Sequence, residues 1–251
     1  MRITSWNIFY KNKRLDDVII HLARSTNDII CLQEVPEHAL PHLDTLPYHM
    51  AHQHTFTTNT GEHIYLVTLS RHKITSQKSI AFPSEWYKRP SLFARLLGSC
   101  IGWHQPYQDR AALLVTTTIN DAPLQILNMH LSVVFVHENV RINEFTKSIA
   151  TIDATQPHII CGDLNILEQP HVKIINWIMG GSLFKNERAL FEDVFSTHHL
   201  SNPLRGCMTH WFTRSQLDHI LVSEHTTIEQ AWVEKNTTGS DHNPVHVHLN
   251  T

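Results

Sequence analysis

Short runs of apolar residues, separated by polar segments, recur along the chain and predict a protein rich in β-strands. Several runs are dense in Val, Ile and Leu, as buried strands are, whereas the run 245–249 alternates apolar and polar residues as a half-buried strand does. The predicted strands cover 2–9, 28–35, 64–70, 111–119, 124–131, 158–164, 217–223, 228–234 and 245–249.

Helical periodicity is found in three of the segments between these strands. In the first of them, Leu15, Val18, Ile19 and Leu22 recur at three- and four-residue spacing and predict one apolar helix face. The three predicted helical segments are 14–25, 137–152 and 171–179.

Helices do not separate every pair of predicted strands, so a purely parallel sheet is not expected. The runs 64–70, 111–119 and 124–131 read as antiparallel neighbours joined by turns such as 120–123. The pattern predicts a mixed α/β architecture with two sheets in a single domain over residues 1–251, without internal repeats.

Segment 82–107 lies between two predicted strands and has six aromatic side chains interleaved with Lys88, Arg89 and Arg95. Aromatic and basic residues together suit stacking on nucleic-acid bases and contact with phosphates. They also suit contact with a membrane interface, and a loop that simply packs on the core would have the same composition. All three interpretations stay open.

Composition narrows the class of protein. The chain has 251 residues, of which 41% are hydrophobic and 17% charged, as in an ordinary soluble globular protein. Its formal net charge is −3, so no global basic field indicates a nucleic-acid binder. A nucleic-acid site would have to be locally basic or use a metal ion to meet phosphate.

The sequence also suggests a cellular compartment. No signal-peptide pattern and no apolar run of transmembrane length are found, which predicts an intracellular, cytoplasmic protein. The four cysteines have no zinc-site spacing. Cys31 and Cys161 lie inside apolar runs and are expected to be buried thiols, and Cys100 and Cys207 could pair only if the fold happened to bring them together.

The most informative feature is the set of polar residues at the ends of predicted strands. Each alone has an ordinary explanation as a turn or cap residue, but strand ends of α/β sheets are where functional sites assemble. The set comprises Asn7, Glu34, His130, Asp163, Asn165, Asp218, Asp241 and His242.

This combination of side chains indicates a particular chemistry. Carboxylate and amide oxygens are hard ligands that suit Mg²⁺ or Mn²⁺ rather than zinc. Histidines oriented by carboxylates can transfer protons or stabilise charge on phosphorus. The chain has no Ser or Cys nucleophile elbow and no Walker loop. Metal-assisted hydrolysis of a phosphate ester is therefore predicted.

Six motifs in order resemble the endonuclease/exonuclease/phosphatase superfamily, and they span nearly the whole chain. Each motif alone is common, but six in the family's order are specific. They are SWNI at 5–8, LQEV at 32–35, MHLS at 129–132, GDLN at 162–165, LDHI at 217–220 and SDHNPV at 240–245. The resemblance implies a four-layer α/β sandwich, in which two mixed β-sheets pack face to face with helices outside and a site at one edge.

The resemblance also implies a metal site and a phosphate contact. Glu34 would be the main ligand of Mg²⁺ or Mn²⁺, supported by Asn7 and Asp241. Arg110, at the start of a predicted strand, matches a position at which relatives place a phosphate-binding basic residue, although an Arg at a strand edge is commonly just solvated.

Catalytic roles are implied in the same way. Asp163 and Asn165 would bind and position the attacking water or the phosphate, with Asp163 as the general base or a second metal ligand. His242 would contact the scissile phosphate with its ring oriented by Asp218. His130 would stabilise the transition state or protonate the leaving group. Glu62 is expected to be the carboxylate behind His130.

At several motif positions the sequence differs from one subclass of the superfamily. Abasic-site endonucleases typically have LQETK where this chain has LQEVP, a Tyr where His130 stands, and an acid at the position of Phe9. The abasic-site subclass is therefore disfavoured. The motifs LQEV and HL do not discriminate among deoxyribonucleases, sphingomyelinases, deadenylases and tyrosyl-DNA phosphodiesterases.

Three functions remain from the sequence. The leading one is a Mg²⁺- or Mn²⁺-dependent phosphodiesterase with a nucleic-acid substrate. The second is the same chemistry on a phospholipid headgroup or another small phosphate ester, with segment 82–107 at the membrane. The third is a non-catalytic member of the fold that binds a partner, which the complete set of site residues disfavours.

Overall fold

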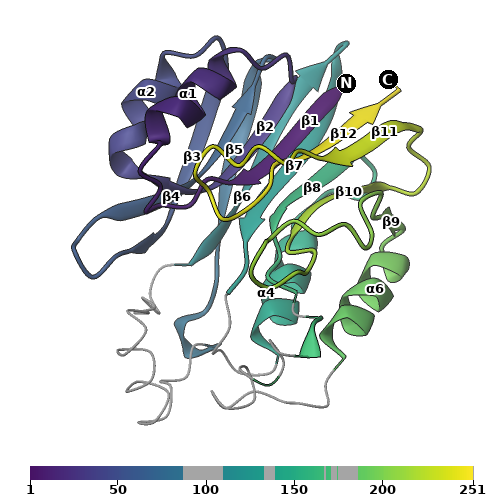
Figure 1. Cartoon of the computed structure of the whole chain (residues 1–251). Coiled ribbons are helices and arrows are strands. Elements are labelled where there is room, and N and C mark those ends of the chain that lie inside the picture. The colour runs from purple at the N-terminus through teal and green to yellow at the C-terminus, as the bar shows by residue number, and fades with distance from the viewer. Residues whose placement is uncertain (87–109, 133–138, 167, 171–173, 175–185, 251) are drawn as a thin grey trace.

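Two six-stranded β-sheets packed face to face form the centre of the fold (Figure 1). The computed structural model describes residues 1–86, 110–132, 139–166, 168–170, 174 and 186–250. Sheet A has the order β11 (Ile228–Val233), β12 (Val245–Leu249), β1 (Arg2–Asn7), β2 (Ile29–Pro36), β4 (His63–Ser70) and β3 (His49–Thr57). Sheet B has the order β5 (Ile74–Ala81), β6 (Ala111–Ile119), β7 (Ala122–His130), β8 (His158–Asp163), β10 (Asp218–Ser223) and β9 (Leu200–Ser201).

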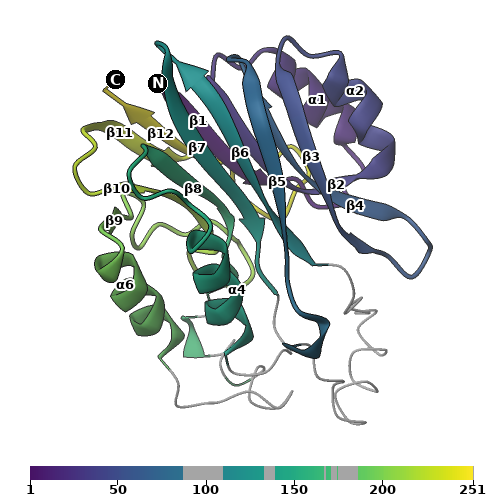
Figure 2. The ribbon, with the colours of Figure 1, turned by 180° about the vertical axis from the view of Figure 1, so that it is seen from behind.

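Helices cover the outer faces of both sheets and complete four layers (Figures 1 and 2). Helix α1 (Leu15–Ala23) buries Val18 and Leu22 against sheet A, as its apolar spacing predicts. The other helices among the described residues are α2 (Leu40–Asp44) on sheet A, α4 (Val140–Ile149) and α6 (Glu187–Thr197) on sheet B, and the short 3₁₀ helices η1 (Glu37–Ala39) and η2 (Ser84–Trp86). The predicted α/β sandwich is confirmed.

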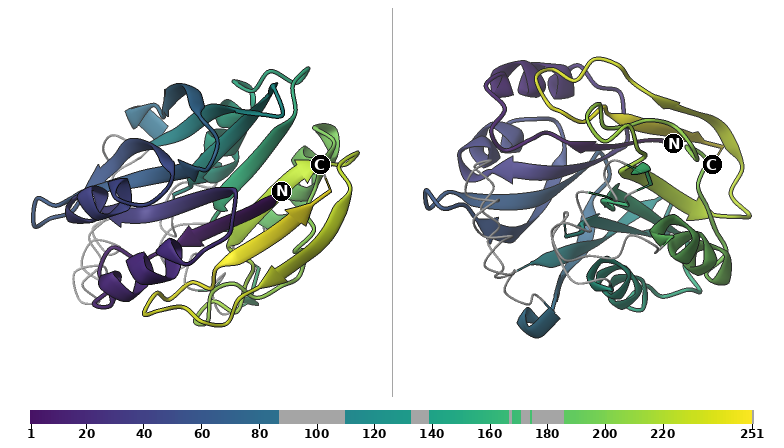
Figure 3. Two further views of the ribbon diagram at one scale, coloured as in Figure 1. Left: turned by 90° about the horizontal axis from the view of Figure 1, so that it is seen from above. Right: turned by 60° about the horizontal axis from the view of Figure 1, so that its bottom comes forward.

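Each sheet contains one parallel strand pair joined by a crossover helix. Strands β1 and β2 are parallel and connected through α1, while β7 and β8 are parallel and connected through α4. The carboxyl ends of such a pair lie at the same edge of their sheet. Because the sheets face each other (Figure 3), the ends of both pairs come together at one end of the sandwich.

The space between the sheets is filled mainly by apolar side chains that alternate along the strands. Ile3, Val245 and Val247 of sheet A pack there with Ile126 and Ile220 of sheet B. The two thiols predicted to be buried, Cys31 and Cys161, lie in the same cluster as free cysteines.

The structure corrects one strand pairing. The run 64–70 was expected beside 111–119, but β4 lies in sheet A between β2 and β3. The turn at 120–123 does join an antiparallel hairpin, which is formed by β6 and β7 alone. Strand β4 faces β6 across the sandwich instead of pairing with it.

Two predicted features fall outside the described residues. The helix expected at 171–179 is one, with only residue 174 described. Segment 82–107 is the other, since only 82–86 of it are described. Within the described parts of the chain, no helix has the length and apolar character needed to cross a bilayer.

Candidate active site

The carboxyl ends of the four parallel strands each supply one polar side chain to the same space. Asn7 ends β1, Glu34 lies near the end of β2, His130 ends β7 and Asp163 ends β8. Strand register places His130 directly beside Asp163 in sheet B. The antiparallel strands β10 and β12 begin at this edge, so Asp218 and the residues just before β12 join the same group.

Glu34 owes its position to an irregular backbone. Its φ of 55° lies in the left-handed region, and the pairing of β2 with β4 shifts register between Leu32 and Val35. A bulge of this kind redirects one side chain at the end of a strand. Asn165, which follows Asp163 in the other sheet, also has a left-handed φ, of 50°.

Asn7 connects the acidic residues of the two sheets. Its Nδ2 donates hydrogen bonds to Oε1 of Glu34 at 3.2 Å and to Oδ2 of Asp163 at 3.1 Å. Its Oδ1 accepts from the backbone N–H of Phe9 at 3.0 Å. In this arrangement Asn7 presents a donor to the site, rather than the oxygen that a metal ligand needs.

His130 is buried with both ring nitrogens lacking a hydrogen-bond partner among the described residues. Its Nε2 lies 3.7 Å from a carboxylate oxygen of Glu34 and 3.7 Å from one of Asp163. Burial, together with the charges of Arg110 and His242, holds the pKa of His130 well below its usual value. The ring is therefore neutral, and its nitrogens are available to a ligand.

Asp218 and His242 form a buried pair. Nδ1 of His242 donates to Oδ2 of Asp218 at 2.8 Å, while its Nε2 lies 3.7 Å from Oδ2 of Asp163. Burial would lower the pKa of His242, but the negative charges of Asp218 and Asp163 outweigh this and raise it to about 10. A protonated imidazole therefore faces the site.

Two carboxylates of the site are held in an environment that suits a cation. Burial first, and then repulsion from Asp241, raise the pKa of Glu34 to about 7. Burial also raises the pKa of Asp163 to about 6, in spite of the opposing charge of His242. Buried acids without enough positive charge around them are typical of a site that takes up a metal ion. The donor set therefore fits Mg²⁺ or Mn²⁺.

Asn165 is fixed close to Asp163. Its backbone N–H donates to Oδ1 of Asp163 at 3.0 Å, and its Nδ2 donates to the backbone carbonyl of Leu131 at 3.0 Å. Asp163 thus has one oxygen held by backbone, and the other directed toward His130 and His242.

Arg110 is held against the backbone that carries His130. It is 7% exposed, and its Nη2 donates to the backbone carbonyl of His130 at 2.6 Å. The expectation for Glu62 is wrong: its carboxylate contacts Nδ1 of the exposed His38 at 2.7 Å. The carboxylates that face His130 are those of Glu34 and Asp163, because they end the neighbouring strands.

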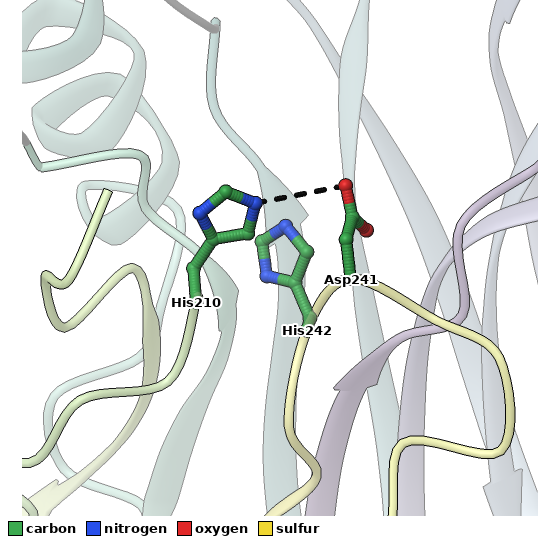
Figure 4. Close-up of side chains that lie close together, drawn as sticks. All are labelled: His210, Asp241 and His242. Atoms are coloured by element: carbon green, nitrogen blue, oxygen red, sulfur yellow. Dashed lines mark ion pairs between the residues drawn. The ribbon is translucent and has the colours of Figure 1, made fainter. Parts of the chain in front are cut away.

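The structure adds one residue that the sequence did not indicate. His210, in the connection between β9 and β10, lies beside the Asp241–His242 turn (Figure 4). Its Nε2 is 3.6 Å from Oδ2 of Asp241, and its ring centroid is 4.6 Å from that of His242. Burial raises the pKa of Asp241, but contact with His210 and the charge of His242 lower it below its usual value.

A sequence profile described as the Endonuclease/Exonuclease/phosphatase family matches residues 4–242. Comparison with curated protein sequences finds no match.

Several solved structures share the fold. The endonuclease/exonuclease/phosphatase from Beutenbergia cavernae DSM 12333 is 17% identical, with a TM-score of 0.73, covering 99% of this chain and 71% of that one. D. rerio TDP2 complexed with single strand DNA product is 18% identical, with a TM-score of 0.66, covering 100% and 99%. ANGEL2, a 2′,3′-cyclic phosphatase, is 14% identical, with a TM-score of 0.66, covering 99% and 94%. At these identities the likeness concerns the fold.

Proposed function

The chain belongs to the Endonuclease/Exonuclease/phosphatase family, and on that premise we propose that it is a divalent-metal-dependent phosphodiesterase acting on nucleic acid. One observation carries the proposal. Oδ2 of Asp163 lies 3.7 Å from Nε2 of both His130 and His242, so a carboxylate and two imidazoles from both sheets converge on one space. Such a group can activate water and stabilise charge on a phosphate.

Glu34 and Asp241 are the residues that would hold the cation. The raised pKa of Glu34 and the buried Oδ1 of Asp241, which has no hydrogen-bond partner among the described residues, support this assignment. When bound, Mg²⁺ or Mn²⁺ would supply positive charge to phosphate oxygens and acidify a bound water. Asn7 would keep Glu34 and Asp163 in place through its two hydrogen bonds.

The remaining side chains have complementary roles in the proposed reaction. Asp163, with a pKa of about 6, is mostly ionised at neutral pH and still basic enough to take a proton from the attacking water. Asn165 would position that water or the phosphate. The protonated His242 would donate to a non-bridging phosphate oxygen, and the neutral His130 would donate to charge that develops on phosphate or on the leaving oxygen. Arg110 would fix the backbone that carries His130.

Two observations favour a nucleic-acid substrate with unstacked bases. Trp211 and Phe212 are 64% and 55% exposed, follow His210 directly in the chain, and contact each other edge to face. Exposed aromatic rings beside a phosphate site suit stacking of single-stranded bases. TDP2, which shares the fold, is known in a complex with a single strand DNA product.

Cleavage of nucleic acid by the purified chain tests the proposal. Supercoiled plasmid and a labelled single-stranded oligonucleotide are incubated with Mg²⁺ or Mn²⁺, with EDTA as the control. We expect metal-dependent cleavage that is lost in both Asp163→Ala and His242→Ala. Full activity in both variants, with their folds intact by circular dichroism, would rule out the proposed site.

The two other functions predict different results when further substrates and ligands are tested. A folded wild-type protein that leaves nucleic acid intact but hydrolyses sphingomyelin or an inositol phosphate would identify the phospholipid or small-ester reaction. A protein that hydrolyses none of these and binds neither Mn²⁺ nor a phosphate ligand in isothermal titration would be a non-catalytic member of the family.

A further inference from the structure

The loop that carries His210 is fastened to the turn that carries Asp241 and His242. Backbone N–H of Thr209 donates to Ser215 at 3.1 Å, and that of Asn243 donates to the carbonyl of Thr209 at 2.8 Å. His210 forms isolated β-bridges to both Ser215 and His242. Its residue exposure is 9%, so the imidazole is held between the two segments rather than lying free in solvent.

Hydrogen bonds at one ring nitrogen determine the tautomer of His210. The backbone N–H of Thr213 donates to Nδ1 at 3.1 Å, and the Thr213 hydroxyl lies 3.0 Å from the same atom. A nitrogen that accepts from a backbone N–H has its lone pair in the ring plane and carries no proton. The proton of the neutral ring is therefore on Nε2, which points toward Asp241 (Figure 4).

This tautomer excludes one interpretation of the cluster. His210, Asp241 and His242 lie close enough for their ligand atoms to surround a metal ion. A metal bound to Nε2 of His210 would require the proton to move to Nδ1, directly against the Thr213 N–H. His210 is thus a hydrogen-bond donor to the group and not a ligand.

Asp241 has the complementary arrangement. Its Oδ2 faces Nε2 of His210 at 3.6 Å, a distance slightly longer than a hydrogen bond. Its buried Oδ1 has no hydrogen-bond partner in the part of the chain that the structure describes. Hydrogen bonds in active sites are often long before a ligand binds and shorten in the complex. One oxygen is therefore directed by His210, and the other is left available.

We propose that His210 is a positioning residue for the cation site: its Nε2–H holds Oδ2 of Asp241, so that Oδ1 stays turned toward a divalent cation. The inference rests on the proposed function, in which Asp241 is a metal ligand. Packing of the His210 ring on His242 fixes the donor's direction. Partners that orient a ligating carboxylate typically contribute about 10- to 100-fold in metal affinity.

Three variants separate the two contacts of the ring. In His210→Gln the amide nitrogen takes the place of Nε2 and can donate to Asp241. In His210→Asn the shorter amide takes the place of Nδ1, so it keeps the Thr213 contact and loses the one to Asp241. His210→Ala loses both. By isothermal titration with Mn²⁺, we expect about tenfold or greater weakening in His210→Ala and His210→Asn, and near wild-type affinity in His210→Gln.

The tautomer is measured on the metal-free protein and does not depend on activity. Long-range ¹H–¹⁵N NMR correlations of His210, assigned by their loss in His210→Gln, should show a protonated Nε2 and an unprotonated Nδ1. A protonated Nδ1, or equal Mn²⁺ affinity in wild type and His210→Asn, would overturn the inference. A wild-type protein that binds no Mn²⁺ would instead contradict the proposed function, while the tautomer would still report on His210.

Discussion

At the scale of single residues, His242 shows how one carboxylate determines the protonation state of a histidine ring. Asp218 is completely buried at the start of β10, and its Oδ2 binds Nδ1 of His242 at 2.8 Å. Its charge is the largest of the effects that raise the pKa of His242. In the proposed reaction the ring would therefore act as a cation because of a neighbour that need not touch the substrate.

Replacing Asp218 with Asn tests this dependence. The amide oxygen can still accept from His242, so the fold should persist, but the negative charge is lost. We expect the pKa of His242 in EDTA-treated protein, followed by NMR titration, to fall from its value of about 10, and turnover to drop about a hundredfold or more. Unchanged titration of His242 in Asp218→Asn would contradict this explanation.

His219, one residue after Asp218, has the opposite electrostatic environment. Its Nδ1 donates to the carbonyl of Leu217 at 2.8 Å, and its Nε2 lies 3.0 Å from Nη1 of Arg188, from which it accepts. Burial, and then the charge of Arg188, hold the pKa of His219 well below its usual value. The folded protein therefore keeps this ring neutral when the unfolded chain would protonate it.

The consequence for stability has a definite sign. A histidine whose pKa is lowered by folding makes the protein less stable as the pH falls below about 6.5, because only the unfolded chain then takes up the proton. As the pH falls from 7.5 to 5.5, the free energy of unfolding of the wild type, measured by urea denaturation, should decrease by about 1.4 kcal/mol more than that of His219→Gln. The contributions of the other histidines cancel because both proteins have them. An equal decrease in unfolding free energy in both proteins would therefore show that His219 is protonated in the folded state.

At the scale of secondary-structure elements, one glycine allows β7 and β8 to pair beside the site. Gly162 has a φ of 148°, and a Cβ at this position would lie 2.0 Å from the backbone oxygen of Met129. That oxygen belongs to the neighbouring strand and cannot rotate away. The close approach keeps His130 and Asp163 in register at the next position.

Gly162→Ala should therefore cost about 3 kcal/mol of unfolding free energy, measured by urea denaturation. Gly61→Ala is the matched control, because Gly61 also has a positive φ, of 85°, but no atom within 4 Å of an added Cβ. We expect about 1 kcal/mol there, from backbone strain alone. Similar losses in both variants would mean that the clash with Met129 is relieved by a shift of the strands.

Elements were predictable from sequence where burial imposes a pattern. Strands β2, β7, β8 and β10 contain apolar runs because both faces of these strands are covered. Strand β5 lies at an edge of sheet B and is mostly exposed, and β3 lies at an edge of sheet A with three His residues. These two strands therefore gave no apolar run. Helix α6 was missed as well.

The candidate site was predictable to the extent that strand ends define it. Asp163 and Glu34 follow directly from the apolar runs before them. His210 could not be found in this way, because residues 202–217 have no periodicity and only their attachment to the His242 turn places the ring. Glu62 was misplaced because its carboxylate contacts His38, whereas His130 lies in the opposite sheet and faces Glu34 and Asp163.

At the scale of the whole molecule, a buried pair of amides joins the two sheets directly beneath the site. Nε2 of Gln33 donates to Oδ1 of Asn128 at 2.9 Å, and Nδ2 of Asn128 donates to the carbonyls of Leu32 and Val67. Both side chains are completely buried. Because Gln33 precedes Glu34, this pair sets the distance between the halves of the site.

The affinity of the whole site for a metal ion should depend on pH. Glu34, with a pKa of about 7, must lose its proton before it can bind a cation. The affinity for Mn²⁺ should therefore rise about tenfold between pH 6 and pH 8. Isothermal titration at each pH, in buffers of different ionisation enthalpy, would detect the proton released. An affinity that is the same at pH 6 and pH 8 would mean that Glu34 is already ionised in the metal-free protein.

Strand β12 lies in the interior of sheet A, between β11 and β1. During synthesis, every chain that stops before residue 245 leaves the edge of β1 without its partner, and an open edge of this kind favours aggregation and recognition by chaperones. A chain that stops before residue 241 also lacks Asp241 and His242. Residues 241–249 therefore contribute both to the strand pairing of sheet A and to the candidate site, so a chain truncated before residue 241 is expected to lack the proposed activity.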